Sequence, residues 1–355
     1  MSIRPDKPVR AAKPHFWQEL KAANKPIFVM APMANVTDSV FRKLFAKFGA
    51  PDVTWTEFVS SDGLISPGRE VLMLDLVYSR KERPIVAQLF TGHPEAMRKA
   101  SKLAAELGFD GIDINMGCPD RAVEKQGGGS ALIRTPKVAV AILEAARAGV
   151  RDAVDAGAIK QPIPVSVKTR LGYNKVEMEW LRTMLEQKPP TLTVHLRTRK
   201  EMSLVDAHWD LMPEIVKLRN EVSPETVLLG NGDVQSIADG AAKIKKYGCD
   251  GVMIGRGIFG KPWLFENIHA QGGPKEARER TPEERLKTMV EHSKMFEKAF
   301  KGVKSFAIMR KHFKAYVNGW PGAAELRAEL MLAEDAKAVA LTVKKWLVEY
   351  KKTQA

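Results

Sequence analysis

Eight short apolar runs, separated by longer amphipathic stretches, constrain the fold of this chain more than any other feature. Most of the runs are apolar or β-branched throughout, as strands buried on both faces of a parallel sheet are. They occupy residues 27–31, 53–56, 85–89, 112–115, 164–168, 191–195, 226–230 and 251–255. Between them lie stretches with apolar residues at helical spacing, such as 95–107 and 137–149.

Eight strands with intervening helices over about 245 residues predict an α/β fold, the (β/α)8 TIM barrel. We expect this barrel to occupy residues 25–272, after a basic N-terminal extension of residues 1–24. A polar linker follows, and helical periodicity then predicts a small all-helical domain over residues 281–355. Thr281-Pro282 followed by two glutamates is typical of a helix start.

The distribution of charge favours an anionic partner. The 355 residues include 56 Lys+Arg and 42 Asp+Glu, a net charge of +14. Residues 1–25 carry a net charge of +4 and residues 275–355 a net charge of +7, so the middle of the chain is nearly balanced. Such an excess favours nucleic acid first and a membrane surface second. The alternative is that basic ends only aid solubility.

The two cysteines, Cys118 and Cys249, are too few for a disulfide framework, and neither belongs to a CxxC pair. We therefore expect no structural zinc and a cytoplasmic location. No apolar run approaches the roughly 20 residues that a membrane-spanning helix needs. The basic N-terminus lacks the apolar stretch of a signal peptide.

Functional residues of a barrel of this kind lie where its strands end. A polar residue or glycine follows nearly every predicted strand, and eight such exits together are hard to explain as turns. The exits are Pro32-Met33, Glu57, Gln88, Asn115, Lys168 with Arg170, His195 with Arg197, Gly230–Asp233 and Gly255–Gly257. The last two are glycine-rich, as in the phosphate sites of TIM barrels, which favours a phosphorylated ligand such as FMN.

Gly255, Gly257 and Gly260 also spell GxGxxG after a strand. A dinucleotide-binding reading of this motif requires a second strand with an acidic residue about 20 positions further on. A Pro-Trp pair and a polar linker follow instead, so we reject that reading.

Cys118 lies between Gly117 and Pro119 at the fourth exit, and we expect it to be functional. A nucleophile would need a histidine base within reach, and no histidine has a spacing that argues for one. A proton donor needs only a protonated thiol, which a free cysteine provides at neutral pH. We therefore favour a proton donor, and we expect Cys249 to belong to the core.

Several segments, in matching order, resemble the tRNA-dihydrouridine synthases, and the resemblance covers about residues 25–320. They are APMANVTDSVFR (31–42), TEFVSSDGL (56–64), AQLFT (87–91), DINMGCP (113–119), VKTRLGYN (167–174), HLRT (195–198), GNGD (230–233) and MIGRGIFGKPWLF (253–265). The resemblance implies an FMN-bearing barrel followed by a helical tRNA-binding domain. It also implies reduction of the 5,6 double bond of particular uridines in tRNA, with NADPH as electron donor.

The resemblance implies roles for individual residues. Cys118 is the general acid, and Asn115, Arg170 and Arg197 bind the target uracil. The cofactor-binding residues are Pro32, Met33, Gln88, Lys168, His195, Asn231, Gly232, Asp233, Gly255 and Arg256. We expect tRNA as partner, a monomer, and neither a membrane nor a metal.

Two departures from the family pattern, Leu196 and Asp120-Arg121, are expected to line the substrate entrance. Basic residues near the C-terminus are the predicted phosphate contacts; a solvated helix face is the alternative. Four of them, Lys294, Lys298, Lys301 and Lys304, are spaced as on one helical face, with interruption of that helix at Gly302 as the alternative. Arg310, Lys311 and Lys314 form a second cluster.

Two other functions remain open. An FMN barrel acting on a free pyrimidine, as a dihydroorotate dehydrogenase does, shares the barrel and the strand-exit residues. An RNA-binding protein with an inactive barrel shares the basic C-terminal region.

Overall fold

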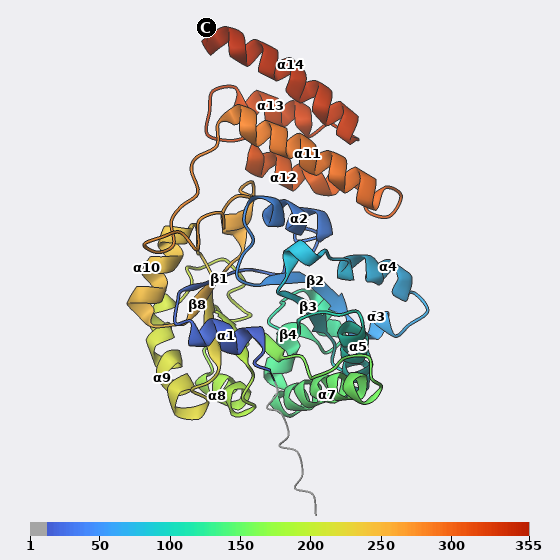
Figure 1. Cartoon of the computed structure of the whole chain (residues 1–355), viewed down its shortest axis with the longest axis vertical. Helices are drawn as coiled ribbons and strands as arrows, with labels where there is room; N and C mark the ends of the chain where they lie inside the picture. Colours follow the sequence, from blue (N-terminus) through green and yellow to red (C-terminus); the bar gives the residue numbers. More distant parts are fainter. Residues whose placement is uncertain (1–12, 355) are drawn as a thin grey trace, which may run out of the picture.

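The computed structural model describes residues 13–354, and its centre is a sheet of eight parallel strands (Figure 1). The strands pair in the order β1-β8-β7-β6-β5-β4-β3-β2, and a bridge between Val29 and Val53 closes the ring. Their bounds are β1 Ile27–Met30, β2 Thr54–Ser60, β3 Ile85–Phe90, β4 Gly111–Met116, β5 Val165–Arg170, β6 Thr191–His195, β7 Val227–Asn231 and β8 Gly251–Ile254. The predicted (β/α)8 barrel is confirmed.

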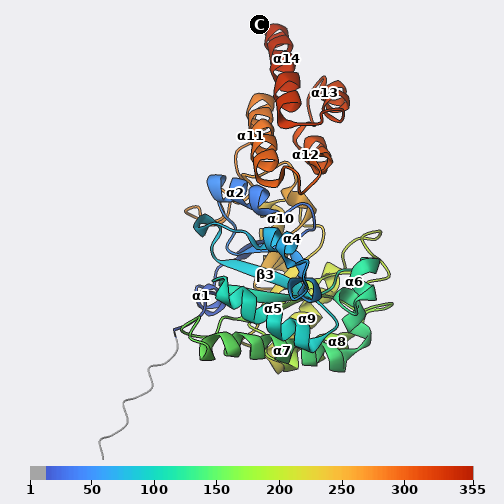
Figure 2. The same cartoon turned by 90° about the vertical axis from the view of Figure 1, so that its right-hand side faces the viewer.

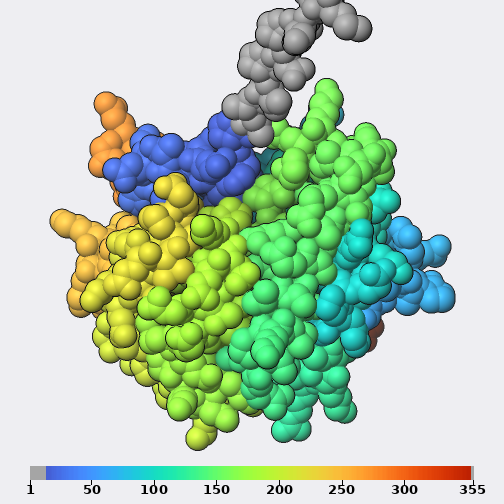
Figure 3. Space-filling view, turned by 90° about the horizontal axis from the view of Figure 1, so that it is seen from below, coloured from blue at the N-terminus to red at the C-terminus, as the bar shows by residue number. Residues whose placement is uncertain are grey.

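Helices follow the strands and cover the outside of the sheet. They are α2 Ser39–Phe48, α3 Ser61–Leu64, α4 Arg69–Met73, α5 Pro94–Glu106, α6 Arg121–Lys125, α7 Pro136–Asp155, α8 Met178–Glu186, α9 Met212–Val222 and α10 Ile237–Tyr247. Seen from the side opposite the C-terminus, successive segments from cyan to yellow cover the surface in chain order (Figure 3). This regular winding is what the alternation of strands and amphipathic stretches predicts.

Helix α1 (Phe16–Ala22) lies within the segment predicted as a basic extension, and it packs on the barrel. The side chain of Trp17 is only 1% exposed, and its ring centroid lies 5.8 Å from that of Trp55 in β2. Helices α1 and α6 lie at opposite ends of the barrel (Figure 2). Residues 1–12, the rest of the predicted extension, lie outside the described part of the chain.

Four helices follow the barrel: α11 Pro282–Phe300, α12 Met309–Tyr316, α13 Ala323–Leu330 and α14 Ala336–Gln354. Thr281 caps α11 with the predicted geometry, exchanging hydrogen bonds with Glu284. These C-terminal helices share an apolar core and are stacked beyond α2 on one side of the barrel (Figure 1). Val40 of α2 belongs to the same apolar cluster. The C-terminal helices are therefore packed against the barrel through α2.

The interface between α2 and the C-terminal helices is aromatic. The ring of Phe41 lies 5.6 Å from that of His292 and 5.1 Å from that of His312. Gly260, the last glycine of the GxGxxG run, has a φ of +69°, and a Cβ built there would lie 2.3 Å from the carbonyl oxygen of Ala315 in α12. This glycine permits close packing of a helix, which is the physical role the motif has here.

One expected helical face is wrong. Helix α11 ends at Phe300, Lys301 is its C-cap, and Gly302 then takes a φ of +79° that reverses the chain. Lys304 therefore does not continue the row of Lys294 and Lys298, both of which are exposed on α11. Within residues 13–354, no helix is long and apolar enough to cross a membrane.

Close packing of α5 on α7 generates a stability prediction. A Cβ on Gly149 of α7 would lie 2.0 Å from the carbonyl oxygen of Arg98 in α5. We expect Gly149→Ala to lower the free energy of unfolding by about 1–3 kcal/mol, the usual cost of overpacking, in a urea titration. Gly68→Ala is the control, because the nearest atom to its Cβ would be a serine oxygen at 3.7 Å. Equal stability of the two variants would contradict the close contact.

Candidate functional site

Strand exits from both ends of the sequence surround one cavity of about 260 Å³. Eleven of the residues predicted to bind cofactor or substrate line it. They are Pro32, Met33, Lys168, Arg170, His195, Arg197, Asn231, Gly232, Asp233, Gly255 and Arg256. Ser203, Val234 and Gln235 also line it, and the sequence analysis did not single them out. The exits of β1, β5, β6, β7 and β8 therefore converge on this cavity, whereas Gln88 of β3, Asn115 of β4 and Cys118 in the loop after β4 are not among its lining residues.

The cavity carries an excess of positive charge. Four of its lining side chains are cationic, whereas Asp233 is the one acid among those that line it. Arg256 donates to Asp233 Oδ1 at 2.7 Å, and Arg197 donates to Oδ2 of the same carboxylate. Burial alone would raise the pKa of Asp233, but the Ala207 N–H and the two arginines lower it. The carboxylate of Asp233 thus holds the guanidinium groups of Arg197 and Arg256 at the cavity, where an anionic ligand can bind them.

The lowered pKa values of Lys168 and His195 show that nearby acids do not balance the positive charge of the cavity. Burial, followed by repulsion from Arg170, lowers the pKa of Lys168 to about 8, so it remains mostly protonated at neutral pH. Burial and four neighbouring cations hold the pKa of His195 well below its ordinary value, so its imidazole is neutral. Arg197 Nη1 lies 3.0 Å from His195 Nε2, and because a guanidinium only donates, the imidazole proton is on Nδ1. His195 therefore carries its one N–H donor on Nδ1.

Two glycines at the cavity have different roles. A Cβ on Gly255 would face Ala31 Cβ at 3.8 Å and Met33 Sδ at 4.0 Å, so a side chain there would enter the space beside Met33, and glycine keeps the backbone accessible to a ligand. Gly232 has a φ of +125°, and its Cβ would lie only 2.7 Å from that of Ala207, so glycine is needed there for the backbone conformation and the close packing. A phosphate-bearing ligand fits both this open backbone and the cationic lining.

Cys118 is positioned through the side chain of Asn115, which lies at the end of β4. Asn115 Oδ1 accepts the backbone N–H of Cys118 at 2.9 Å and that of Gly117 at 3.1 Å. Arg170 holds the same loop from the other side, donating from Nε to the carbonyl of Gly117 at 2.7 Å. Burial raises the pKa of the Cys118 thiol above its ordinary value of 9.0, so the thiol is protonated at neutral pH.

The amide of Asn115 is in turn oriented by a chain of buried side chains, which we call the amide relay. Asn115 Nδ2 donates to Gln88 Oε1 at 3.1 Å, and Gln88 Nε2 donates to Asp113 Oδ2 at 2.7 Å. Ser166 donates to the other oxygen of Asp113 at 2.6 Å. Burial raises the pKa of Asp113 to about 6, so its acceptor form predominates at neutral pH. The carboxylate fixes the polarity of both amides.

Sequence reasoning missed Asp113 and Ser166. The one available signal was an acid inside the apolar run 112–115. The expectation that Leu196 lines the substrate entrance is wrong, because Leu196 is fully buried in the barrel core. Asp120 and Arg121 are exposed, and Asp120 caps α6. Cys249 is buried in the core as expected.

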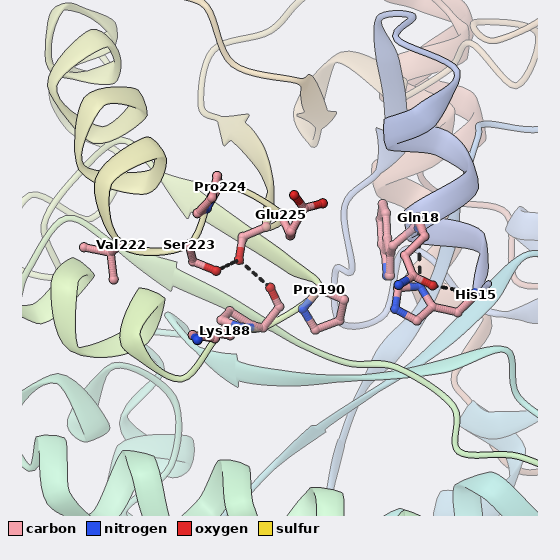
Figure 4. Close-up of a pocket in the computed structure, with 11 residues that line it drawn as sticks. His15, Gln18, Lys188, Pro190, Val222, Ser223, Pro224 and Glu225 are labelled. Carbon is pink, nitrogen blue, oxygen red and sulfur yellow. Dashed lines mark hydrogen bonds between the residues drawn. The ribbon is translucent and has the colours of Figure 1, made fainter. Parts of the chain in front are cut away.

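A second cavity, of about 410 Å³, lies at the other end of the strands (Figure 4). His15 and Gln18 of the α1 region face the segments that precede β6 and β7 across it. None of the predicted site residues lines it. Over residues 13–354, no three His, Cys, Asp or Glu side chains are grouped so as to hold a metal ion.

Comparison with known proteins assigns a family to this geometry. The sequence model of the family described as Dihydrouridine synthase (Dus) matches residues 29–352. The probable tRNA-dihydrouridine synthase of Staphylococcus aureus (strain COL) is 44% identical over 323 residues, 90% of this chain and 92% of that protein. The probable tRNA-dihydrouridine synthase 2 of Bacillus subtilis (strain 168) is 44% identical over 321 residues, 89% and 92% of the two chains. Among solved structures, an old yellow enzyme homologue from Zymomonas mobilis is 13% identical with a TM-score of 0.45, covering 70% of this chain and 90% of that one, a likeness too weak to carry an argument.

The polarity of the amide relay can be reversed as a test. Asn115→Asp places an oxygen opposite Gln88 Oε1, and if the Gln88 amide turns over, its oxygen meets the carboxylate of Asp113. We expect a loss of about 1–3 kcal/mol in the free energy of unfolding, because a buried polar group is left unsatisfied. Adding Asp113→Asn restores a donor for the reversed amide, so the double variant is expected to regain most of that stability. Additive losses in urea titrations would show that the relay has no fixed polarity.

Proposed function

The chain belongs to the dihydrouridine synthase family, and from this premise we propose that it reduces uridines in tRNA to dihydrouridine. The observation that carries the proposal is a protonated thiol, Cys118, held by Asn115 and Arg170 beside a cationic cavity. Two relatives that are 44% identical over about nine tenths of the chain are named as probable tRNA-dihydrouridine synthases. The pairing of a proton donor with an anion site suits reduction by a phosphorylated cofactor.

We propose FMN as that cofactor and NADPH as its reductant. Arg256, the neutral His195 and the backbone at Gly255 would hold the phosphate, and Met33 and Lys168 would lie against the flavin ring. Asn231 Oδ1 accepts from Lys168 Nζ at 3.2 Å, which fixes the lysine on the cavity wall. When bound, the flavin supplies the hydride that reaches C6 of the uracil.

Cys118 completes the reduction by giving the Sγ proton to C5 of the same ring. Protonation of C5 needs an acid that is still protonated at neutral pH, and the buried thiol meets this requirement. Arg170 and Arg197 would orient the uracil carbonyls, since both guanidinium groups reach the cavity. The relay through Asn115 keeps the thiol in place while the base is bound.

A uridine inside folded tRNA must leave its stack to enter this cavity, at a cost of a few kcal/mol. We propose that exposed cations on the C-terminal helices offset that cost by binding backbone phosphates. Lys294 and Lys298 on α11 and Arg310 and Lys314 on α12 are exposed. In this proposal residues 281–355 form the tRNA-binding domain, and the enzyme acts as a cytoplasmic monomer.

Replacement of the thiol tests the assignment of the acid. We expect Cys118→Ala to keep its flavin and its NADPH oxidation but to lose most tRNA reduction, measured as reoxidation of the anaerobically reduced enzyme by unmodified tRNA. Free uracil and orotate are the control substrates, and fast reoxidation by orotate would favour the free-pyrimidine enzyme. Undiminished turnover of Cys118→Ala on tRNA would exclude the thiol as the acid.

The pH dependence gives the same assignment a second measurement. A raised thiol pKa keeps the proton on sulfur to higher pH, so deprotonation of Cys118 should slow tRNA reduction only above the ordinary thiol pKa of 9.0. Lys168, with a pKa of about 8, also loses its proton between neutral pH and pH 9, so the limb that belongs to Cys118 is the one above 9.0. A basic limb below neutral pH would contradict an acid with a raised pKa.

The phosphate contacts predict a salt dependence. If Lys298 binds a phosphate, Lys298→Ala should reduce the slope of log affinity for tRNA against log salt by about 0.7–0.9. Lys99→Ala is the control, because this exposed lysine on α5 pairs with Glu95 on the outside of the barrel. An unchanged slope for Lys298→Ala would show that Lys298 binds no phosphate and lies on a solvated helix face.

A further inference from the structure

Lys304 reaches from the C-terminal helices back into the barrel. The chain reverses at Gly302, and Lys304 Nζ then lies 2.9 Å from Glu57 Oε2 and 2.7 Å from Asp75 Oδ1. The ammonium also lies 4.9 Å from the ring centroid of Phe300, at the end of α11. Its side chain is 14% exposed, so this is a largely buried ion pair rather than a surface one.

Glu57 connects this lysine to the loop that follows β1. Its side chain is 5% exposed, and while Oε2 accepts from Lys304, Oε1 accepts the backbone N–H of Asn35. Asn35 has a φ of +54°, in the left-handed region that asparagine adopts more readily than most residues other than glycine. One carboxylate therefore bridges the C-terminal helices and a left-handed turn in the loop.

The loop of residues 32–37 forms part of the cavity wall. Pro32 and Met33 line the cavity, and the loop is tied internally by the Met33 N–H donating to Thr37 Oγ1 at 2.9 Å. Arg42 of α2 donates to the carbonyl of Thr37 at 2.7 Å. A change in the conformation of Asn35 would therefore occur only two residues from Met33, which lines the cavity.

The charges at this junction are divided between the two sides. The barrel contributes three neighbouring acids, Asp38, Glu57 and Asp75, and the C-terminal helices contribute Lys304 and Lys311. Burial, followed by repulsion from Asp75, raises the pKa of Glu57 to about 7. Without the ammonium of Lys304, the two acids that it bridges would lie close together with no cation between them.

We propose that Lys304 is a positioning residue: through Glu57 it makes docking of the C-terminal helices set the loop of residues 32–37 at the cavity. The inference rests on the proposed function, because the role of Met33 beside the flavin comes from it. Docking of the C-terminal helices thereby fixes the position of the tRNA that they bind relative to the cofactor that the barrel binds. An isolated barrel would contain every cavity residue and still lack the support for this loop.

The test compares Lys304→Met with Lys47→Met in the full-length protein with FMN. Lys47 of α2 pairs with Glu291 of α11 at 2.7 Å across the same junction, but its side chain is 53% exposed and it does not contact Glu57. Loss of an exposed pair has little effect, whereas loss of one partner of a buried pair leaves an uncompensated charge wherever Glu57 is ionised. The variants are therefore compared at a pH well above the Glu57 pKa of about 7. The two variants therefore separate general docking from support of the loop.

Hydrogen–deuterium exchange of the peptide that contains residues 32–37 is the first measurement. We expect Lys304→Met to speed its exchange by roughly tenfold or more and Lys47→Met by less than about twofold. We also expect Lys304→Met to weaken FMN binding while its affinity for tRNA stays within about twofold of the wild type. Unchanged exchange in Lys304→Met, or equal changes in both variants, would overturn the proposal.

A second variant removes the charge from both partners. Glu57→Gln keeps an oxygen for the N–H of Asn35 and needs no counter-ion, so Lys304→Met/Glu57→Gln should regain most of the slow exchange and most of the FMN affinity. Failure of this double variant to recover would overturn the charge argument. Exchange is measured without tRNA, so the coupling and the proposed function can fail separately. If Lys304→Met speeds exchange of the loop but the wild-type protein does not reduce tRNA, the coupling is supported and the proposed function is refuted.

Discussion

Hydrogen bonding between β1 and β8 is the interaction on which the rest of the molecule depends. It joins Ile27–Met30 to Gly251–Ile254, segments more than two hundred positions apart, in parallel register. With that pairing and the bridge between Val29 and Val53 the sheet becomes a ring, and the carboxyl ends of all eight strands lie at one end of it. Pro32 and Met33 after β1 meet Gly255 and Arg256 after β8 only because of this closure. The cavity is a consequence of topology before it is a consequence of any particular side chain.

The burial that brings the cationic side chains of the cavity together also disfavours their charged forms. Lys168, Arg170 and Arg197 are largely buried and are held by the amide oxygen of Asn231, backbone carbonyls and one aspartate, and burial lowers the pKa of both Lys168 and Arg170. A folded chain tolerates such an arrangement when a ligand supplies the missing negative charge. The amide relay is the opposite case, because Asp113, Gln88 and Asn115 are hydrogen-bonded to one another, to Ser166 and to the Cys118 loop. One part of the site is thus left open for a ligand, and the other is fixed in advance.

The strands were predictable to within a few residues because a strand buried on both faces appears as a continuous apolar run. Most residues that line the cavity were predictable for the same reason, since the first polar residue after such a run marks the strand exit. Lys304 was placed on the face of Lys294 and Lys298 by its spacing, although Gly302 marked a place where the helix could end, and the chain does turn there. Asp113 was passed over because its partners, Gln88 and Ser166, lie about 25 and 53 positions away, and no local pattern connects them. Contacts that depend on tertiary closure leave no periodic trace in a sequence.

The glycine at position 260 has a consequence for how this protein can be divided. Backbone atoms of α12 occupy the space where a side chain at 260 would stand, and Phe259 stacks on His312 at 5.7 Å. Further along, Arg280 binds Glu266 at 2.8 Å and lies over the ring of Trp263. The segment from β8 to α11 therefore contacts both the C-terminal helices and the barrel, to whose core Ile258, Leu264, Phe265 and Ile268 belong. A chimaera that exchanges those helices at the polar linker, where the composition changes, would leave Gly260 and Phe259 facing a foreign α12, so the segment has to be matched to both parts.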